Sequence, residues 1–368
     1  MKNKIGVLGC FGTIGRHTVE KLLSNGFSVI GAQRRKSDMF DGFENFRYCK
    51  VDVSDTEELN EFCKKCDVVI NCISPAYIYG SLVAKSAARA NSVYIDGVDF
   101  ILKDKTLPEN GVYIMAAGYV PGLSEFIPKA IIKNEFDKSE RLVIYQGGTE
   151  LCSEAAFADI VLSANDSGYS DCVYSKSKIV PFHISIRNKM KIPDFPCEAL
   201  IKAFLSHEMV SLAEKTGLSD LYWFNAYQDM FFVNLLLRAM RCSIGYEKNE
   251  AAEKIRECMR KSVKGISDGE PYTIIGMEIQ GVRDGKTKRI HGCLYLKNSS
   301  RICGYVLAQT AMDILESGVN PGVYYAYEII ENDYLDKLIY ELETDEYLII
   351  EEIPEDKSIL LKIPFINK

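Results

Sequence analysis

Short apolar runs alternate with amphipathic stretches through roughly the first 130 residues of the chain. The run at residues 67–73 is almost wholly apolar, as a strand must be when helices cover both faces of its sheet. The alternation predicts an α/β fold with a doubly wound parallel Rossmann sheet. After a first strand that ends at Gly9, we expect strands at residues 27–33, 46–53, 67–73, 92–96 and 112–117, and helices after residue 15, at 56–66 and at 80–90.

The pattern changes from about Arg141 to that of a second, α+β domain, which we expect to bind substrate and to form dimer contacts. The aromatic-rich stretch 221–240 predicts a central or dimer-interface helix, and therefore a homodimer. The other expected elements are a strand at 141–146, helices at 151–164, 198–215 and 302–316, a polar loop or lid up to about residue 178, a hairpin of 272–282 and 288–296 turned at Asp284-Gly285, a strand within 320–327 and a strand pair in the tail 345–368.

The composition is typical of a globular protein that acts on a small molecule. Of 368 residues, 47% are hydrophobic and 26% charged, and 44 basic against 51 acidic side chains give a net charge of −7. That balance implies no general affinity for nucleic acid or an anionic membrane, and no apolar stretch approaches the length of a membrane span. We expect a cytoplasmic protein whose twelve cysteines are reduced. Cys63 and Cys66 have metal-ligand spacing, but no second pair accompanies them, so no metal is expected.

A glycine-rich loop follows the first strand, with the sequence Gly9-Cys-Phe-Gly12-Thr-Ile-Gly15. Gly9 supplies the backbone freedom that a sharp strand-to-helix turn needs. Gly12 leaves room for phosphate oxygens beside the main chain, and Gly15 lets the helix lie close to the sheet with its free amides facing the anion. The spacing and its strand-helix context predict a dinucleotide site that includes Phe11, Thr13 and Ile14.

The end of the second strand indicates which dinucleotide is preferred. An NAD site carries Asp or Glu there for the ribose 2′-hydroxyl, whereas this chain has Gln33 followed by Arg34 and Arg35. A guanidinium group holds a 2′-phosphate by a bidentate contact, so we expect NADP(H). The alternative is an ordinary solvated basic turn.

Two further strand ends contribute to the predicted cofactor site. Asp52 and Val53 end the third strand, beside the adenine in such folds, although capping of the next helix explains this strand end equally well. Cys72 and Ile73 end the fourth strand and Ser74 follows it, and all three are expected to line the nicotinamide. Cys72 also fits a small buried hydrophobe, and Ser74 also fits the start of a turn.

The assembled motifs resemble the saccharopine dehydrogenase family over most of the chain. The glycine loop resembles its phosphate loop, residues 68–75 its nicotinamide loop, and residues 93–97 its strand with an aspartate. Residues 118–123 and 318–323 resemble its two Pro-Gly turns. Val120 departs from the aspartate that the family places before the first Pro-Gly, and residues 326–328 depart from its usual Pro-Glu.

The resemblance implies a division of the chain and an activity. It implies a dinucleotide-binding domain at 1–135, a substrate and dimerisation domain at 136–300, a segment at 301–330 that returns to the first domain and an extension at 331–368. Many members reduce an imine, formed from a 2-oxo acid or aldehyde and an amine, with a hydride from the cofactor. Such a reaction needs a proton donor near the nitrogen and cations for substrate carboxylates.

Three residues are candidates for the chemistry. Asp96 ends an apolar strand at the ligand edge, where desolvation raises a carboxyl pKa toward acid-base use, although a loop hydrogen bond explains it as well. Tyr119 offers a phenol or an aromatic packing group, and Ser74 offers a hydroxyl. The remaining candidates are His183 and His291 as proton donors and Arg187, Arg238 and Arg241 for carboxylates, with surface or structural roles as the alternatives.

We therefore expect an NADP(H)-dependent oxidoreductase of the saccharopine dehydrogenase type, acting on an imine or secondary amine derived from an amino acid or polyamine. Two alternatives stay open. One is an NADPH-dependent reductase of carbon–carbon double bonds, and the other is a non-catalytic regulator that senses the dinucleotide.

Overall fold

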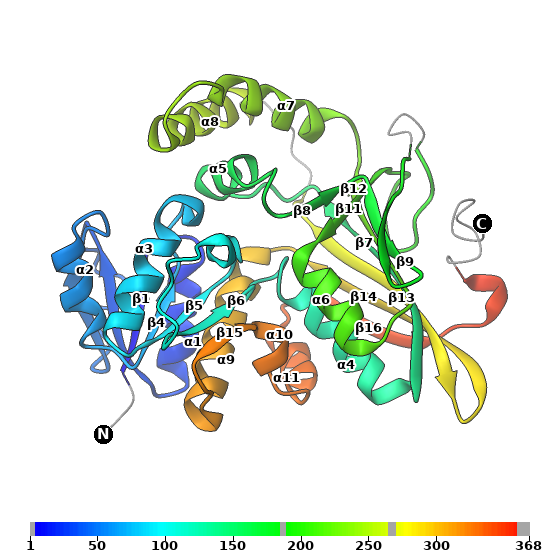
Figure 1. Cartoon of the computed structure of the whole chain (residues 1–368), viewed down its shortest axis with the longest axis horizontal. Coiled ribbons are helices and arrows are strands. Elements are labelled where there is room, and N and C mark those ends of the chain that lie inside the picture. Colours follow the sequence, from blue (N-terminus) through cyan, green and yellow to red (C-terminus); the bar gives the residue numbers. More distant parts are fainter. Residues whose placement is uncertain (1–3, 185–188, 264–269, 359–368) are drawn as a thin grey trace.

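The computed structural model describes residues 4–184, 189–263 and 270–358. Two sheets lie side by side, the first within the N-terminal third of the chain and the second in its middle, with helices around both (Figure 1). Strand β15 (Gly322–Tyr325) pairs with the first sheet although it lies near the C-terminus.

Seven parallel strands form the first sheet, in the order β15-β6-β5-β4-β1-β2-β3. The other six are β1 (Lys4–Leu8), β2 (Ser28–Gln33), β3 (Phe46–Lys50), β4 (Val68–Asn71), β5 (Val93–Asp96) and β6 (Val112–Met115). Helices α1 (Gly15–Ser24) and α9 (Ser299–Ser317) cover one face, and α2 (Thr56–Cys63) and α3 (Ala76–Arg89) cover the other. The central strands are buried on both faces, which explains their continuous apolar sequence. The predicted doubly wound parallel sheet is confirmed.

Nine strands form the second sheet, which is mixed. Strand β12 runs parallel to β7, and all other pairings in this sheet are antiparallel. These strands are β7 (Lys138–Gly148), β8 (Gly168–Ser170), β9 (Cys172–Ser175), β10 (Lys178–Pro181), β11 (Leu200–Ser206), β12 (Asp220–Tyr227), β13 (Thr273–Arg283), β14 (Lys286–Leu296) and β16 (Tyr347–Glu352). Helices α4 (Leu123–Glu135) and α6 (His207–Thr216) pack on one face, and one apolar core continues through them from the first sheet to the second.

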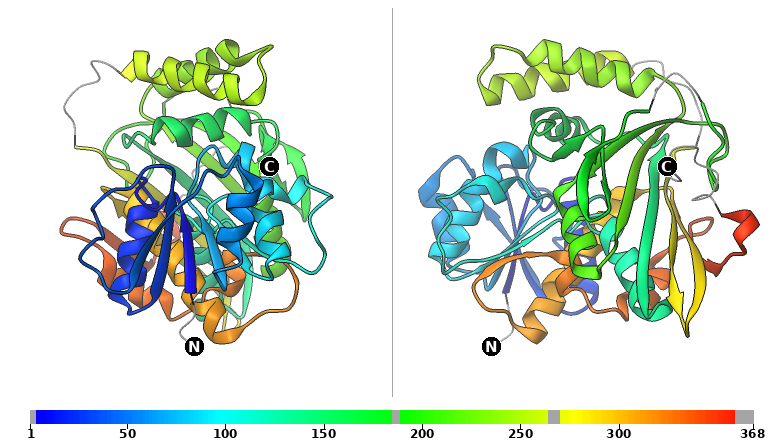
Figure 2. Two further views of the ribbon diagram at one scale, coloured as in Figure 1. Left: turned by 90° about the vertical axis from the view of Figure 1, so that its left-hand side faces the viewer. Right: turned by 45° about the vertical axis from the view of Figure 1, so that its right-hand side comes forward.

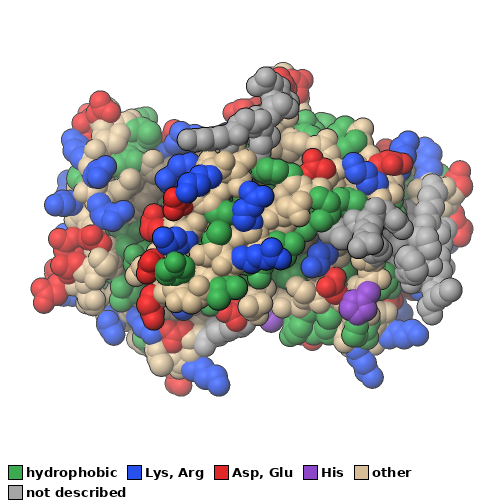
Figure 3. Space-filling model, turned by 90° about the horizontal axis from the view of Figure 1, so that it is seen from above, with side chains coloured by type: hydrophobic (Ala, Val, Ile, Leu, Met, Phe, Trp, Pro, Cys, Tyr) green, Lys and Arg blue, Asp and Glu red, His purple; other side chains and the backbone are tan. Residues whose placement is uncertain are grey.

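Three helices form a separate layer above the two sheets, which we call the helical cap: α5 (Glu154–Leu162), α7 (Phe231–Ser243) and α8 (Lys248–Val263) (Figure 2). They share an apolar cluster around Phe157, Leu235 and Ile255. The outer face of α7 carries exposed Leu237 and Met240, and Figure 3 shows hydrophobic side chains among Lys and Arg on this upper side of the molecule. No helix in the described ranges is long and apolar enough to cross a membrane.

The C-terminal part completes both sheets. Helices α10 (Ala326–Ile329) and α11 (Tyr334–Glu341) follow β15, and β16 pairs with β14. The short 3-10 turns are Phe100–Lys103 and Glu355–Lys357. All twelve cysteines are free.

The predicted helix over residues 221–240 is confirmed only in its second half, where residues 231–240 lie in α7, and is wrong in its first half. The first half is strand β12, whose side chains are almost all buried because they alternate between two apolar clusters, with Leu221 and Trp223 in one and Tyr222 and Phe224 in the other. A strand buried on both faces has no polar alternation, so its apolar run resembles that of a buried helix. The continuous aromatic helix on which the homodimer was predicted is therefore divided between β12 and α7, and the homodimer stays a prediction.

Two other predictions are corrected by the sheet pairings. The polar stretch before residue 178 is no loop or lid but contains β8 and β9, and the predicted helix 198–215 begins as strand β11 before it becomes α6. In the described part of the tail, β16 is a strand added to the hairpin, as expected for one member of the predicted strand pair. The tail beyond residue 358 lies outside the described residues.

Candidate functional site

The glycine loop has the backbone geometry of a phosphate-binding turn. Gly9 has a φ of +78°, and a Cβ there would lie 2.6 Å from the carbonyl oxygen of Cys72. A Cβ on Gly15 would lie 2.2 Å from the Gly9 carbonyl oxygen, so only glycine lets α1 begin this close to the strand. Within the described chain, the amides of Thr13, Ile14 and Gly15 donate to no protein acceptor. The loop therefore presents free N–H groups at a helix N-terminus, where an anion is favoured.

Phe11 and Gln33 fix this loop to the second strand. The Phe11 amide donates to Oε1 of Gln33 over 3.0 Å. The Phe11 ring stacks on Phe40 and Tyr48, with 5.9 Å between ring centroids in each pair. The Tyr48 hydroxyl in turn donates to the Gln33 carbonyl over 2.8 Å. These contacts give both residues a role in positioning the loop, in addition to the predicted contact with the cofactor.

Arg34 and Arg35 follow β2 and are exposed beside the loop. Asp52 follows the neighbouring strand β3, and Val53 is buried in the core under α2. Hydrogen bonds from Ser54, helped by the nearby charges of Arg34 and Lys50, lower the pKa of Asp52. Arg34 and Asp52 thus lie at adjacent strand ends, where the adenosine half of a dinucleotide is expected.

A carboxylate of the helical cap holds the loop after β4. The Ser74 hydroxyl donates to Oδ2 of Asp159 on α5. The same carboxylate accepts the amides of Ala76 over 3.0 Å and Tyr77 over 2.9 Å, at the N-terminus of α3. Asp159 is 7% exposed, and burial raises its pKa against these hydrogen bonds. Sequence analysis missed this residue because no motif marks it.

Arg256 of α8 reaches the same loop. Its Nη2 donates to the Ser74 carbonyl oxygen over 3.2 Å, and its Nη1 pairs with Glu253. Its Nε is buried and has no acceptor among the described residues. An orphaned guanidinium N–H beside the expected nicotinamide position is a ready donor for a ligand oxygen.

Cys72 lies on the other side of this loop, against α1. Its Sγ is 3.8 Å from Oγ1 of Thr18, and burial raises the pKa of its thiol to about 12. Cys72 is therefore a neutral thiol in the floor of the site, and Ile73 packs partly buried against the core under α3.

Asp96 is buried beneath α3 and joins the ends of two strands. Its Oδ2 accepts the Tyr94 hydroxyl over 2.5 Å and the Asn71 amide over 2.8 Å, and its Oδ1 accepts the amide of Val98 over 3.2 Å. Burial raises the pKa of Asp96 from 3.8 to about 7, against these hydrogen bonds. The raised pKa fits the predicted acid-base role, whereas the bonded carboxylate also fits a structural one, so the catalytic role stays a prediction.

Tyr119 lies where the carboxyl edge of the first sheet meets the second sheet. Its hydroxyl is 3.1 Å from Oγ1 of Thr273, the first residue of β13, and its amide donates to Sγ of Cys303. Glu150, just beyond β7, accepts the amide of Ser299 at the start of α9 over 3.0 Å. Burial raises the pKa of both Tyr119 and Glu150. The Tyr119 phenol is therefore a protonated hydrogen-bond donor at the boundary between the two sheets.

The other predicted candidates lie elsewhere. Arg238 and Arg241 line a cavity of about 290 Å³ on the outer face of α7, and His291 is 3.2 Å from Asp194 on the second sheet. His183 is exposed, and Arg187 lies outside the described residues. No group of His, Cys, Asp and Glu in the described part of the chain has the arrangement of a metal site.

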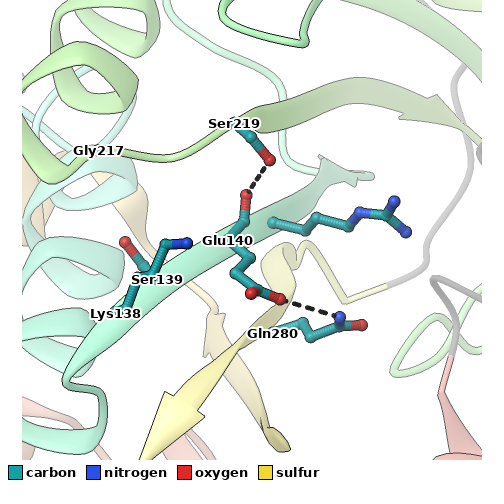
Figure 4. A pocket seen from close by; sticks show the side chains of 7 residues that line it. Lys138, Ser139, Glu140, Gly217, Ser219 and Gln280 are labelled. Atoms are coloured by element: carbon teal, nitrogen blue, oxygen red, sulfur yellow. Dashed lines mark hydrogen bonds between the residues drawn. The ribbon is translucent and has the colours of Figure 1, made fainter.

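A second cavity, of about 320 Å³, lies at the start of β7, at the opposite end of that strand from Gly148 (Figure 4). Ser219 and Gln280 donate hydrogen bonds to Glu140 there. The cavity is therefore separate from the loops that form the predicted cofactor site.

Comparison with protein families identifies the N-terminal third. Residues 5–116 match the model of the saccharopine dehydrogenase NADP-binding domain. This part of the chain is therefore similar to the NADP-binding domains of that family. The resemblance predicted from the glycine loop and the strand ends is thereby confirmed. No curated protein sequence matches the chain.

Solved structures extend the likeness to the whole saccharopine dehydrogenase-like fold. Apo saccharopine dehydrogenase (L-Glu forming) from Saccharomyces cerevisiae has a TM-score of 0.65 at 14% identity, covering 96% of this chain and 100% of its own. Homospermidine synthase from Legionella pneumophila, in complex with NAD, has a TM-score of 0.52 at 14% identity, covering 95% and 92%. At this identity the likenesses establish a shared fold.

The buried Asp96 predicts a pH-dependent stability. Because its folded pKa is raised from 3.8 to about 7, its contribution is present at low pH and lost as the pH rises through that interval. We expect the free energy of unfolding of the wild type, relative to Asp96→Asn, to fall by on the order of 4 kcal/mol between about pH 4 and pH 7. Denaturant titrations at several pH values measure it.

Asp52→Asn is the control of opposite sign, since the pKa of Asp52 is lowered and its contribution is lost as the pH falls. Parallel pH profiles for the wild type and Asp96→Asn would show that Asp96 has an ordinary pKa.

Proposed function

We propose that the chain is an NADP(H)-dependent oxidoreductase of the saccharopine dehydrogenase type, which reduces an imine, or oxidises a secondary amine, derived from an amino acid or polyamine. The observation that carries the proposal is the loop after β4. Asp159 and Arg256 from the second half of the chain hold it in a buried setting against the nucleotide-binding sheet. Hydride transfer needs such a site, because water must be kept from the reacting carbon.

The glycine loop would hold the diphosphate through the free amides of Thr13, Ile14 and Gly15. The bound cofactor would supply or accept the hydride. Ser74 and Tyr119 would present hydroxyl groups to the substrate from either side, each already oriented by a partner, Asp159 and Thr273. Arg256 would hold a substrate carboxylate through its free Nε–H. Asp96 would act as a proton reservoir behind the loop, as its raised pKa allows.

Arg34 is proposed to set the preference for NADP(H). One charge-assisted contact contributes about 1.5 to 3 kcal/mol, which corresponds to roughly tenfold to a hundredfold in affinity. We expect Arg34→Ala to weaken NADPH binding by that factor and to leave NADH binding unchanged, as measured by calorimetry. Lys36→Ala is the control, since Lys36 pairs with Asp41 on the surface. Equal losses for both coenzymes would contradict a 2′-phosphate contact.

The reaction class is tested by mixing the protein with NADPH, a panel of 2-oxo acids and a panel of amines. Imine reduction predicts that the absorbance of NADPH falls only when both substrates are present. Loss with an activated alkene alone would replace the proposal by a carbon–carbon double-bond reductase. Binding of NADPH without turnover of any mixture would replace it by a dinucleotide sensor.

Arg256 provides the residue-level test. We expect Arg256→Gln to raise the KM for the 2-oxo acid by about tenfold to a hundredfold, the value of one charge-assisted contact, with a smaller effect on the KM for the amine. Arg260→Gln is the matched control: it lies one turn further along α8, is 57% exposed and pairs with Glu154. Unchanged KM values in Arg256→Gln would contradict the proposed contact with a substrate carboxylate. Loss of NADP⁺ binding in this variant would instead show that Arg256 holds the Ser74 loop.

A further inference from the structure

Two cysteines of the helical cap lie on neighbouring helices. Cys242 is in the last turn of α7, and Cys258 is in the second half of α8. Residues 244–247 connect these helices, which lie side by side as a hairpin (Figure 2). Of the chain's twelve cysteines, all of which lie in the described ranges, Cys242 alone is exposed, whereas Cys258 is 8% exposed. Both thiols are free, and the function proposed above uses neither.

Two contacts fix the register of this hairpin. At one end, Nη1 of Arg238 on α7 donates to Oγ of Ser262 on α8 over 3.4 Å. Toward the connection, Nζ of Lys254 on α8 lies 5.4 Å from the centre of the Tyr246 ring. Position 238 is therefore paired with position 262 across the hairpin, and position 246 is paired with position 254.

The two cysteines are centred between these contacts. Cys242 is four residues, about one helical turn, from each contact on its side of the hairpin, and Cys258 is four residues from each contact on the other side. In packed helices, facing Cα atoms come near the span of about 4.4 to 6.8 Å that a disulfide needs. The register therefore places Cys242 opposite Cys258, where a disulfide can join α7 to α8.

The surroundings of the two thiols differ. Cys258 belongs to the apolar cluster that α5, α7 and α8 share. Burial raises the pKa of the Cys258 thiol and the neighbouring Cys242 raises it further, whereas the charge of Arg238 lowers it. Cys242 is open to solvent, so a dissolved oxidant reaches this thiol first. A protected second thiol beside an exposed one is the arrangement that stops oxidation at a reversible disulfide.

We propose that Cys242 and Cys258 are a redox-active dithiol, which a peroxide converts to a reversible disulfide across the helical cap. The Cys242 thiolate attacks one oxygen of hydrogen peroxide, the O–O bond breaks, and hydroxide leaves a sulfenic acid behind. The Cys258 thiolate then attacks the Cys242 sulfur, so that the S–S bond forms, the S–O bond breaks and a second hydroxide leaves. The two thiol protons convert both hydroxides to water, and the two thiols together lose two electrons to one peroxide.

Helix α8 is held in place on both sides of Cys258. Two residues before it, Nη2 of Arg256 donates to the Ser74 carbonyl oxygen over 3.2 Å. Two residues after it, Nη2 of Arg260 pairs with Glu154 of α5 over 2.6 Å. The disulfide would therefore link α7 to a helix that α5 and the loop after β4 already hold. Its formation needs neither coenzyme nor substrate and is independent of the proposed function.

The test is peptide mapping of the folded, reduced protein after treatment with hydrogen peroxide. Remaining thiols are blocked, single chains are isolated on a non-reducing gel, and trypsin is added. We expect peptides 242–248 and 257–260 to be joined, two hydrogen atoms lighter than their sum, and dithiothreitol to separate them. A wild-type protein in which Cys242 stays reduced, joins another peptide or ends as a sulfinic acid overturns the proposal.

Single variants separate the roles of the two thiols. Cys258→Ala keeps a small apolar side chain in the cluster but removes the second thiol, so at the same peroxide dose we expect at least tenfold more sulfinic acid at Cys242 than in the wild type. Cys49→Ser is the matched control, because Cys49 is a half-buried thiol on β3, and this variant should form the disulfide as the wild type does. Equal yields of sulfinic acid at Cys242 in Cys258→Ala and the wild type would contradict the role of Cys258.

Discussion

The carboxylate of Asp159 is the contact on which the arrangement of the two halves depends. It crosses from the helical cap to the nucleotide-binding sheet and accepts the Ser74 hydroxyl and two amides of α3. Hydrogen bonds to a charged group contribute about 1.5 to 3 kcal/mol each, and the N-terminus of a helix favours a negative charge. The loop after β4 is thus completed by a residue of α5, so both parts of the chain must be in place before the loop has its final shape.

The part of the site that could be predicted from the sequence is the part that is local. Gly9 and Gly15 reveal the phosphate turn because the backbone angle and the close approach leave no other residue type. The strand ends at Gln33 and Ser74 follow from the alternation of apolar and amphipathic stretches. Each of these signals lies within a few residues of the atoms that it positions, and the family comparison at residues 5–116 covers the same stretch.

The rest could not be predicted because its partners are far apart in the chain. Asp159 lies 85 residues from Ser74, and Arg256 lies 182 residues from it, and neither belongs to a motif. Strand β12 was not predicted for a different reason: apolar clusters cover both of its faces, and this removes the alternation by which strands are recognised.

The hydrogen bond between Gln33 and Phe11 separates the choice of coenzyme from the shape of the diphosphate-binding loop. Gln33 occupies the position at which NAD-binding proteins carry a carboxylate, yet its Oε1 is used to hold the amide of the glycine loop. A glutamate at this position would offer the same acceptor to that amide while bringing a negative charge toward the ribose. Coenzyme choice in this protein can therefore drift during evolution by exchange of an isosteric side chain, with the diphosphate cradle left intact.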